Sequence, residues 1–362
     1  MIKENWDVLV RRDDFGVTDV REATNLTLEP GEVRLSVERF GVTSNNVTYA
    51  YLGEAAGYWD AFPAPAGWGR VPAWGFATVE ASRNPDYAEG TRVFGLVPMF
   101  TRFTVAPESA YGGFSDSAPH RRTMHPFYRQ YRIVGPGDAL DGMRTVFRSV
   151  YRTSLLLADV VSEKAAELGA HVTALITSAS SKTALGLAHA LSGRDRVTTH
   201  GLTSAGNLAF VRGTGLYEAV TTYDTVGDAG MASPVVLTDF AGRGFVVSAV
   251  HERFGDDLAP SQAVGGTHTE AFEAAARATG LPGPAPTRVF GPALEAERIE
   301  RVGAAAYAAA VDEAEGEFVA AARHWLRVDD QSGSEVVVRV LAEAFSGRLD
   351  ADVVQVLHPN GL

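Results

Sequence analysis

The chain has no cysteine among its 362 residues. This absence excludes disulfides, thiolate catalysis and cysteine-ligated zinc, and we expect a cytoplasmic protein. Positive charge is scarce as well, because 32 Lys and Arg residues face 44 Asp and Glu residues, for a formal net charge of −12. Binding to nucleic acids or anionic membranes needs concentrated Lys and Arg, so we expect neither as a partner and expect a small-molecule substrate instead.

Long apolar runs are missing too. No stretch reaches the roughly 18 apolar residues of a membrane-spanning helix, and the first residues, MIKENWDVLVRRDD, lack the apolar core of a signal peptide. Hydrophobic residues make up 46% and charged residues 21%, which is typical of a soluble globular protein. The length exceeds what one hydrophobic core organises, so we expect two domains.

The first part of the chain, residues 1–110, predicts short strands in a small barrel or sandwich. Apolar and polar residues alternate most clearly at 32–40, as in a half-buried antiparallel strand. Similar runs occur at 7–11, 74–80, 91–96 and 101–106. Between them lies an aromatic segment, residues 49–68, which we expect to be a loop that either lines a pocket or covers the core of the barrel.

Residues 111–135 carry the densest cationic and aromatic cluster of this acidic chain. Its members are His120, Arg121, Arg122, His125, Tyr128 and Arg129. Two interpretations stay open: a substrate-facing loop that attracts an anion, or a solvated connector.

From about residue 140 the pattern alternates between helices and strands, which indicates a parallel α/β sheet. Expected strands lie at 172–176, 197–202, 219–223, 233–239 and 258–264, with a last strand at 353–357. Expected helices lie at 141–157, 159–168, 184–191, 304–325 and 336–345. A further helix carries His251, which we expect on the surface.

Glycine is missing where this pattern would use it most, in the turn at 177–183 between the first strand and its helix. Such a turn forms an anion site, because backbone N–H groups and the positive end of the helix dipole meet there. Hydroxyl and ammonium donors stand in its place: Ser178, Ser180, Ser181, Lys182 and Thr183. They predict phosphate binding, or else the serines only cap a structural helix. A nucleoside triphosphatase loop is disfavoured because its required glycines are absent.

An acid is missing as well. A strand that binds NAD usually ends in a carboxylate for the ribose hydroxyls, but no acid occurs from 198 to 207. Thr203, Ser204 and Asn207 predict hydrogen bonds to a 2′-phosphate instead, which favours NADPH over NADH. This stretch also has no Lys or Arg, so Lys182 or Arg212 would have to reach over.

Three segments resemble a known family. They are VRLSVERFGVTSNNVTYAYLG (33–53), VPAWGFATVEA (71–81) and GTRVFGL (90–96). Together they resemble the medium-chain dehydrogenase/reductase superfamily, most closely its zinc-free quinone oxidoreductase-like members. The pattern also resembles a branch described only as a domain of unknown function. Ala73, Trp74 and Gly75 replace the Gly-His-Glu of the family, so its catalytic zinc is not expected.

The resemblance implies an α/β protein with a β-rich GroES-like barrel domain and a Rossmann domain with a doubly wound parallel sheet. It places the first domain at 1–137, the dinucleotide domain at 138–326 and a return segment at 327–362. The reaction it implies passes a hydride to an activated C=C or C=O bond, and a homodimer is the expected assembly.

The resemblance also implies site residues. Candidate catalytic residues are Asn46, Tyr49, Tyr51, Tyr128, Tyr151, Thr153 and His268, the last open to the interpretation of a polar loop residue. Thr267 and Tyr223 join the cofactor set, Tyr223 because a tyrosine after the third strand binds the 2′-phosphate in similar reductases. An NADPH-dependent reductase is therefore expected. A non-redox enzyme of the lyase, decarboxylase or hydratase kind, or a non-catalytic binding protein, remain the alternatives.

Overall fold

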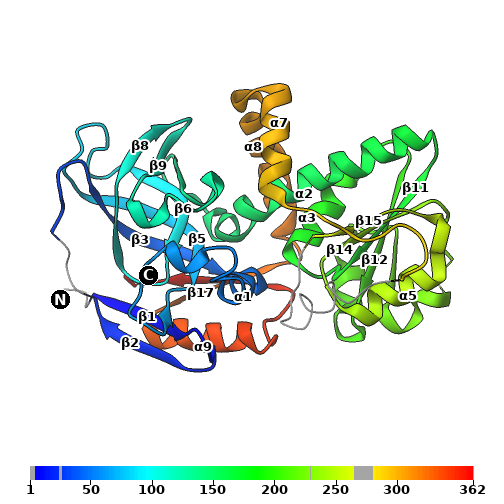
Figure 1. Ribbon diagram of the computed structural model, residues 1–362, viewed down its shortest axis with the longest axis horizontal. Helices are drawn as coiled ribbons and strands as arrows, with labels where there is room; N and C mark the ends of the chain where they lie inside the picture. The colour runs from blue at the N-terminus through cyan, green and yellow to red at the C-terminus, as the bar shows by residue number, and fades with distance from the viewer. Residues whose placement is uncertain (1–4, 24–26, 229, 265–279, 362) are drawn as a thin grey trace. The chain divides into compact units, whose positions relative to one another are not determined.

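The computed structural model describes residues 5–23, 27–228, 230–264 and 280–361, and it divides into two compact units (Figure 1). The first unit holds Met1–Val146 with Arg327–Leu362, and the second holds Phe147–Leu326. Helix α2 (Asp141–Leu168) begins in the first unit and ends in the second. The sequence predicted two helices there, but the segment is one continuous helix, in which Ala158 is fully buried.

The first unit is rich in antiparallel strands. One sheet has the order β2-β1-β4, and a second has the order β17-β18-β3-β5-β6-β10-β9-β8, with β7 paired to β3. The strands are β1 (Trp6–Arg11), β2 (Thr18–Glu22), β3 (Val33–Val42), β4 (Trp68–Gly69), β5 (Pro72–Ser82), β6 (Arg92–Pro98), β7 (Arg102–Val105), β8 (Pro107–Ala110), β9 (Gly113–Asp116), β10 (Gln130–Ile133), β17 (Arg327–Ser332) and β18 (Val353–His358). Only β17 and β18 pair in parallel among these ladders of the described chain.

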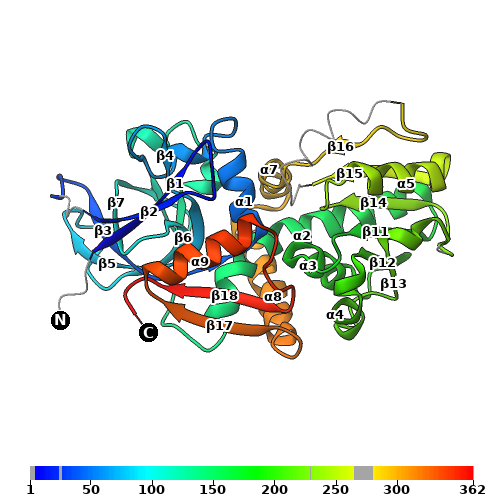
Figure 2. The same ribbon diagram turned by 90° about the horizontal axis from the view of Figure 1, so that it is seen from below.

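The core of this unit follows from the predicted alternation. Val33, Leu35 and Val37 of β3 point into the core, whereas the residues between them are half-buried. Helix α9 (Ser334–Phe345) places Val337, Val340, Leu341 and Ala344 in the same core, the spacing of one helical face. Figure 2 shows this helix beside β18. The predicted helix at 336–345 and strand at 353–357 are both confirmed.

The aromatic segment is a loop for most of its length, as predicted, but two short helices occupy part of it. Helix α1 (Ser44–Tyr51) occupies its beginning, because the Thr43 side chain accepts the Asn45 N–H while Asn46 Oδ1 accepts the Thr43 N–H. The short 3₁₀ helix η1 (Tyr58–Asp60) follows. Tyr49, Tyr58, Trp59 and Phe62 all lie in the hydrophobic core, so these aromatics cover and fill the barrel.

The second unit contains one parallel sheet of order β13-β12-β11-β14-β15-β16. Its strands are β11 (Val172–Thr177), β12 (Val197–Thr203), β13 (Ala219–Thr222), β14 (Val235–Asp239), β15 (Leu258–Ala263) and β16 (Thr287–Arg288). This is the doubly wound Rossmann order 3-2-1-4-5-6. The predicted strands of this sheet are therefore confirmed within one or two residues at their ends.

Helices cover both faces of this sheet, and Figure 1 shows α2 and α5 on opposite sides of the strands. The helices after α2 are α3 (Lys182–Leu191), α4 (Leu208–Gly213), α5 (Gly244–Phe254), α7 (Gly291–Val302) and α8 (Ala304–Ala322). Short 3₁₀ helices η4 (Ala205–Asn207) and η5 (Tyr223–Asp228) connect the strands on one side. Val246, Val250 and Phe254 of α5 pack with strand residues in one core cluster.

His251 was predicted on the surface, and this prediction is wrong. Its side chain is fully buried on α5. Nδ1 lies 2.9 Å from the Pro282 carbonyl oxygen and Nε2 lies 3.0 Å from Ser261 Oγ. A buried imidazole needs a partner at both ring nitrogens, and these two contacts provide them. His251 therefore connects α5 to β15 and to the backbone at Pro282.

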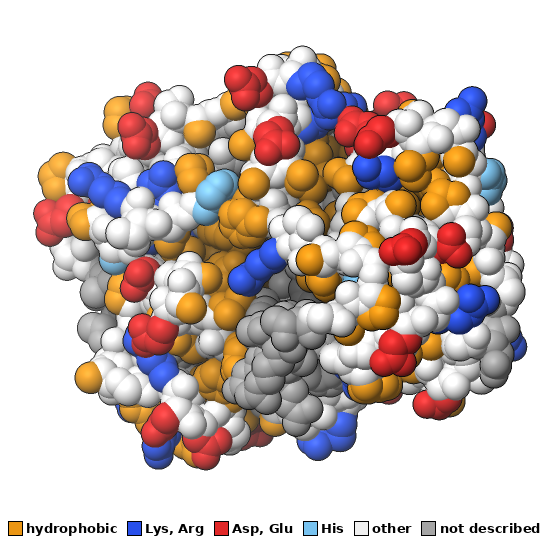
Figure 3. All heavy atoms as spheres, turned by 45° about the vertical axis from the view of Figure 1, so that its right-hand side comes forward, with side chains coloured by type: hydrophobic (Ala, Val, Ile, Leu, Met, Phe, Trp, Pro, Cys, Tyr) orange, Lys and Arg blue, Asp and Glu red, His pale blue; other side chains and the backbone are white. Residues whose placement is uncertain are grey.

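None of the described helices is long and apolar enough to cross a membrane. Figure 3 shows acidic and basic side chains interspersed over one face of the molecule.

Candidate functional site

The candidate site lies at the switch point of the parallel sheet. After β11 the chain moves outward to β12 and β13, then returns to form β14 on the other side of β11. In doubly wound sheets, ligands bind beyond the carboxyl ends of the two strands where the order reverses. Here those ends are Thr177 of β11 and Asp239 of β14.

The turn after β11 holds its shape without glycine. Ser178 takes a positive φ of 47°, a conformation that glycine adopts without strain and that costs other residues about 1 to 2 kcal/mol. The Ser181 N–H closes the turn on the Ser178 carbonyl at 2.7 Å. Ser181 Oγ then accepts the Ala184 N–H at 3.3 Å and caps α3. Serine therefore replaces glycine while the backbone keeps the glycine-like geometry.

Distant segments converge on this turn. Asn207 Nδ2 donates to Ser180 Oγ at 2.9 Å, and the Ser178 N–H donates to the Tyr223 hydroxyl at 3.1 Å. The Tyr217 hydroxyl donates to the Ala179 carbonyl at 2.9 Å. The structure thus brings together four of the predicted cofactor residues, from three connections of the sheet. Tyr217 is a neighbour that the sequence did not indicate.

The remaining predicted cofactor residues take different places. Lys182 is the first residue of α3, and the carbonyl of Thr183 accepts a hydrogen bond from Ser154 Oγ at 2.8 Å. Thr203 ends β12 and is buried, and Ser204 is the N-cap of η4. The predicted residues Thr267 and His268 lie outside the described residues.

A buried acid that the sequence did not single out lies under the turn. Thr177 Oγ1 donates to Asp239 Oδ1 at 2.5 Å and accepts the N–H groups of Phe240 and Ala241 at 2.9 and 3.1 Å. Asp239 Oδ2 accepts the Gly242 N–H at 3.0 Å. Burial raises the pKa of Asp239, and the hydrogen bonds from Thr177, Gly242 and Ala241 oppose that shift. These hydrogen bonds connect the carboxyl ends of β11 and β14.

Arg243 is a second residue that the sequence did not identify. It follows the loop after β14, residues 240–242, and its guanidinium carbon lies 5.9 Å from the centroid of the Tyr223 ring. The side chain is exposed, and the neighbouring Phe245 is 60% exposed with its ring centroid 6.5 Å from that of Tyr223. The only signal in the sequence was an arginine between two glycines after a strand.

Three of the predicted catalytic residues lie in α1 of the first unit: Asn46, Tyr49 and Tyr51. Both ends of the Asn46 side-chain amide are hydrogen-bonded. Oδ1 accepts the Thr43 N–H, and Nδ2 donates to the Pro72 carbonyl at 2.8 Å. The Tyr49 hydroxyl accepts hydrogen bonds from Asn45 Nδ2 at 2.7 Å and Trp74 Nε1 at 2.8 Å. Burial raises the pKa of Tyr49 well above that of a free tyrosine. Tyr51 ends α1 and is half-buried.

Tyr128 belongs to the same aromatic cluster as Tyr49. Its hydroxyl accepts a hydrogen bond from the Tyr58 hydroxyl at 3.0 Å, and the two rings meet edge to face with centroids 5.2 Å apart. The ring of Tyr58 is in turn 4.7 Å from that of Tyr49. Burial raises the pKa of Tyr128 as well. Both hydroxyls therefore stay protonated at ordinary pH.

Arg121 fits neither interpretation of the cationic segment, because its side chain is neither solvated nor open to an anion, whereas His120 and Arg122 beside it are exposed. The guanidinium is 1% exposed and pairs with the equally buried Asp116 at 3.1 Å. It also donates to the Tyr131 hydroxyl and to the Tyr128 carbonyl, both at 2.6 Å. Burial raises the pKa of Tyr131 to about 12. Arg121 is thus a central element of the first unit's core.

Tyr151 and Thr153 lie on α2 in the second unit. The Tyr151 hydroxyl is 2.8 Å from His189 Nδ1, and its ring stacks on Phe318 of α8 with centroids 5.0 Å apart. His189 stands near the end of α3, seven residues and about two helical turns from its start, so Tyr151 lies away from the turn that precedes α3. Thr153 packs closely against Gly291, where an added Cβ would meet its hydroxyl at 2.7 Å.

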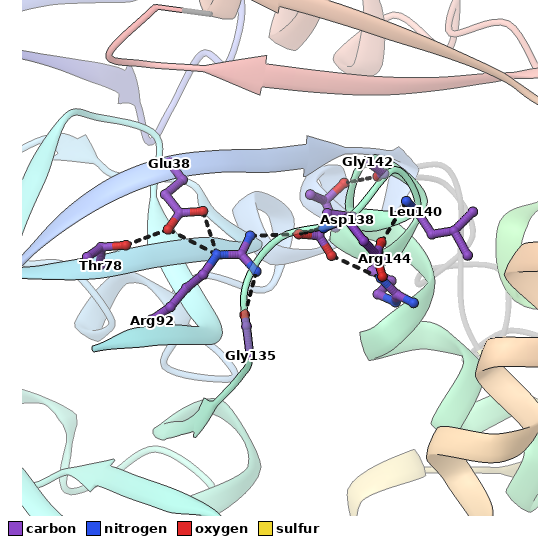
Figure 4. Close-up of polar contacts among 10 residues, drawn as sticks. Glu38, Thr78, Arg92, Gly135, Asp138, Leu140, Gly142 and Arg144 are labelled. Carbon is purple, nitrogen blue, oxygen red and sulfur yellow. Dashed lines mark hydrogen bonds and ion pairs between the residues drawn. The ribbon is translucent and has the colours of Figure 1, made fainter. Parts of the chain in front are cut away.

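A third polar cluster surrounds the start of α2 and is shown in Figure 4. Arg92 pairs with Glu38 and with Asp141, each at 2.8 Å, and donates to the Gly135 carbonyl at 3.2 Å. Asp141 also pairs with Arg144 at 3.0 Å. Carboxylates and guanidinium groups alternate through this network, so it holds α2 to the barrel rather than presenting charge to a ligand.

Among the described residues, no group of three or more His, Asp or Glu side chains is arranged to hold a metal ion.

The donor set of the turn fits the pyrophosphate of a dinucleotide. Ser178, Ser180 and Lys182 surround the first turn of α3, and the carboxylate beneath them, Asp239, is already held by the Thr177 hydroxyl and the two backbone N–H groups of Ala241 and Gly242. Hydroxyl, ammonium and amide donors are the groups that bind phosphate oxygens. The end of β12, Thr203 with Ser204, contributes hydroxyls and no acid.

Comparison with known proteins agrees with this architecture. A family model described as "Protein of unknown function (DUF2855)" matches residues 40–350. No curated protein sequence matches the chain.

Solved structures resemble the whole chain. CurA from Vibrio vulnificus in complex with NADPH has a TM-score of 0.62 at 11% identity, covering 99% of this chain and all of that one. TarJ from S. aureus in complex with NADPH has a TM-score of 0.56 at 11% identity, covering 98% of both chains. The yhdH oxidoreductase from Salmonella enterica in complex with NADP has a TM-score of 0.52 at 12% identity, covering 98% and 99%. The expected fold, a β-rich GroES-like domain with a Rossmann domain, is confirmed.

Proposed function

The chain belongs to the DUF2855 family, and we propose that this member is a zinc-independent, NADPH-dependent reductase of an activated C=C or C=O bond in an enone- or quinone-like small molecule. The observation that carries the proposal is the turn at the switch point. Ser178, Ser180 and Lys182 follow the first strand of a sheet of order 3-2-1-4-5-6, and dinucleotide folds bind pyrophosphate after that strand. Together with the end of β12, which has no acid, this position supports the proposal. Three similar structures are complexes with NADPH or NADP.

Within this proposal, the residues of the turn hold the nucleotide. The first-turn amides of α3, the Ser180 hydroxyl and the Lys182 ammonium bind the pyrophosphate, and Thr203, Ser204 and Tyr223 lie on the side of the adenosine. NADPH supplies a hydride when it is bound. The protein's task is then to orient the substrate and to stabilise the oxygen that gains charge.

Tyr49 is the residue that we propose as the proton donor to that oxygen. Its hydroxyl oxygen accepts from Asn45 and Trp74, and neither contact uses the hydroxyl's own proton. The raised pKa keeps the group protonated, while the Trp74 donor stabilises the phenolate that donation would leave. Trp74 thus supports the hydroxyl at the position where the resembling family carries a histidine.

Titration with nucleotides tests the cofactor. We expect NADPH to bind with micromolar affinity and at least about tenfold more tightly than NADH, a difference of about 1.4 kcal/mol. Quenching of tryptophan fluorescence and a thermal shift of the full chain measure both affinities. A chain that responds to neither nucleotide at millimolar concentration has no dinucleotide site, and the reductase proposal then fails.

Replacement of Tyr49 tests the chemistry. With NADPH and a panel of enones and quinones, Tyr49→Phe is expected to lower kcat by about 10²- to 10⁴-fold while leaving NADPH affinity within twofold. The loss of NADPH absorbance follows the reaction. Tyr58→Phe is the matched control, since it removes a neighbouring buried hydroxyl that donates to Tyr128. Equal losses in both variants would assign Tyr49 a packing role only.

A non-redox enzyme on the same fold remains the second candidate, and one observation favours it. The turn satisfies part of its own hydrogen bonding, because Tyr223 accepts the Ser178 N–H and Asn207 donates to Ser180. A lyase, decarboxylase or hydratase would need no nicotinamide. NADPH binding without consumption on any of the carbonyl and alkene substrates, together with product formation in its absence, would select this candidate. Homodimer formation and a small-molecule partner belong to both candidates.

A further inference from the structure

The proposed function does not say which side chain of the second unit supplies positive charge to the 2′-phosphate of NADPH. A 2′-phosphate carries up to two negative charges, and proteins that select it usually supply a guanidinium or ammonium group. Residues 198–207, which end β12 and begin the next connection, contain no Lys or Arg. Selection of NADPH over NADH therefore requires a cation from another part of the chain.

Neither of the two cations considered from the sequence is suited to the 2′-phosphate. Arg212 lies on α4 and its Nη2 donates to the Val220 carbonyl of β13 at 3.2 Å, so its head group is directed to the backbone of that strand. Lys182 opens α3, which places it with the amides that bind the pyrophosphate. The ribose of a dinucleotide binds at the end of the second strand of this fold, here Thr203 of β12, which pairs with Thr222. The 2′-phosphate therefore needs a charge on the side of the next residue, Tyr223.

Arg243 is the cation on that side. Its guanidinium carbon lies 5.9 Å from the centroid of the Tyr223 ring, within the distance of a cation–π contact. The Tyr223 hydroxyl reaches the turn, where it accepts the Ser178 N–H at 3.1 Å and has a long contact of 3.4 Å with Ser178 Oγ. The exposed ring of Phe245 extends this surface next to the arginine.

The position of Arg243 is fixed by the network beneath the turn. Thr177 and Asp239 accept the N–H groups of Phe240, Ala241 and Gly242, which folds the loop after β14 around the carboxylate. Gly242 completes the bend with a φ of 62°. Arg243 then becomes the N-cap residue of α5, with its carbonyl accepting the Val246 N–H at 3.0 Å. This hydrogen-bonded loop therefore places the Arg243 side chain next to the Tyr223 ring.

We propose that Arg243 selects the nucleotide, its guanidinium binding the 2′-phosphate of NADPH with the Tyr223 hydroxyl as a second donor. This inference rests on the proposed function and names the source of its specificity. Both charge and geometry are suitable, because a guanidinium donates two parallel hydrogen bonds to phosphate oxygens. Tyr223 holds the guanidinium by its ring and contributes its hydroxyl at the same edge.

The test uses the full chain and two probes, 2′,5′-ADP and 5′-AMP, beside NADPH and NADH. Arg243→Gln is expected to weaken 2′,5′-ADP and NADPH by about 10- to 100-fold and to leave 5′-AMP and NADH within about twofold. Arg212→Gln is the matched control and is expected to leave all four affinities within about twofold. Isothermal titration calorimetry and the ratio of kcat/KM for NADPH and NADH provide two readouts.

The outcomes separate this inference from the proposed function. Equal weakening of NADPH and NADH by Arg243→Gln would place the arginine at the pyrophosphate and overturn the inference, as would unchanged affinities. A wild-type chain that binds neither 2′,5′-ADP nor NADPH overturns the inference and the cofactor together. If 2′,5′-ADP binding depends on Arg243 but no substrate is reduced, the inference stands and only the reductase proposal fails.

Discussion

Replacing Arg121 by methionine is expected to lower the free energy of unfolding of the first unit by about 3 to 5 kcal/mol. The guanidinium and the Asp116 carboxylate are each 1% exposed, so the variant would leave a buried negative charge without its counter-ion. It would also remove the donors to the Tyr131 hydroxyl and to the Tyr128 carbonyl. Urea unfolding, followed by far-ultraviolet circular dichroism and tryptophan fluorescence, measures the change.

The next residue provides a matched control. Arg122 is exposed and donates to the Ser117 carbonyl at 3.1 Å, so Arg122→Met is expected to cost less than about 1 kcal/mol. If Arg121→Met does not fold, Arg121→Lys and Asp116→Asn still give measurable values. Replacing both members of the pair by apolar residues should cost less than the single change, because no lone charge remains. Equal losses for Arg121→Met and Arg122→Met would contradict this account of the core.

Arg121 also shows where reasoning from the sequence meets its limit. Composition placed this arginine in a polar, irregular segment, and both sequence interpretations left it in contact with solvent or ligand. Its burial depends on Asp116, Tyr131 and the ring of Phe62, whose centroid lies 5.1 Å from the guanidinium carbon. Phe62 is distant in sequence, and the strand alternation around Asp116 does not reveal that its carboxylate turns inward. A buried ion pair depends on tertiary contacts, which local sequence patterns do not reveal.

More of the parallel sheet than of this ion pair could be predicted from the sequence. Strand and helix periodicity identified β11, β12, β13, β14 and β15, because a strand buried on both faces gives a continuous apolar run such as Val172–Thr177. The turn after β11 was found from its position between a strand and a helix. Its internal contacts were only partly accessible: a role for Tyr223 came from the resemblance, whereas its bond to the Ser178 N–H came from the fold.

Residues that act through the loop after β14 were missed for a different reason. In the sequence, Asp239 is only the last residue of the expected strand at 233–239, and no local pattern assigns a role to Arg243. Both gain their roles from the parallel pairing of β14 with β11, which places Thr238 beside Ile176 and so brings Asp239 to Thr177. This pairing joins residues about sixty positions apart, and no local pattern encodes it.

Thr177→Val is the second change with a large expected effect, because Thr177 is both donor and acceptor in a site that excludes water. Valine keeps the shape but removes the donor to Asp239 and the acceptor for the Phe240 and Ala241 N–H groups. The Phe240 N–H would lose its acceptor, whereas the Ala241 N–H keeps its bond to Asp239 Oδ1. A buried N–H without a partner costs about 1 to 3 kcal/mol and the lost bond to the carboxylate adds about 1 kcal/mol, so we expect a loss of about 2 to 4 kcal/mol at neutral pH. Thr177→Ser keeps the hydroxyl and should cost less than about 1.5 kcal/mol.

The cost of Thr177→Val should also depend on pH, with a sign that follows from Asp239. Burial already raises the pKa of this carboxyl, and the hydrogen bond from Thr177 holds the shift down. Removing that bond raises the pKa in the folded state further, so the folded variant retains its proton to higher pH than the wild type. The variant's extra instability is therefore smallest at acid pH, where both folded forms are protonated. It grows as pH rises between the two folded-state pKa values and is constant above them.

Urea unfolding of wild type, Thr177→Val and Thr177→Ser between about pH 4 and pH 8 measures this dependence, because that window starts near the pKa of an unfolded aspartic acid. Asp256→Asn serves as the control, since Asp256 is an exposed aspartate in the short 3₁₀ helix that follows α5 and should shift stability by less than about 0.5 kcal/mol at every pH. A cost of Thr177→Val that stays the same from acid to neutral pH, or a serine variant as unstable as the valine variant, would show that the hydroxyl does not support the Asp239 carboxylate. The loop that carries Arg243 would then owe its shape to packing alone.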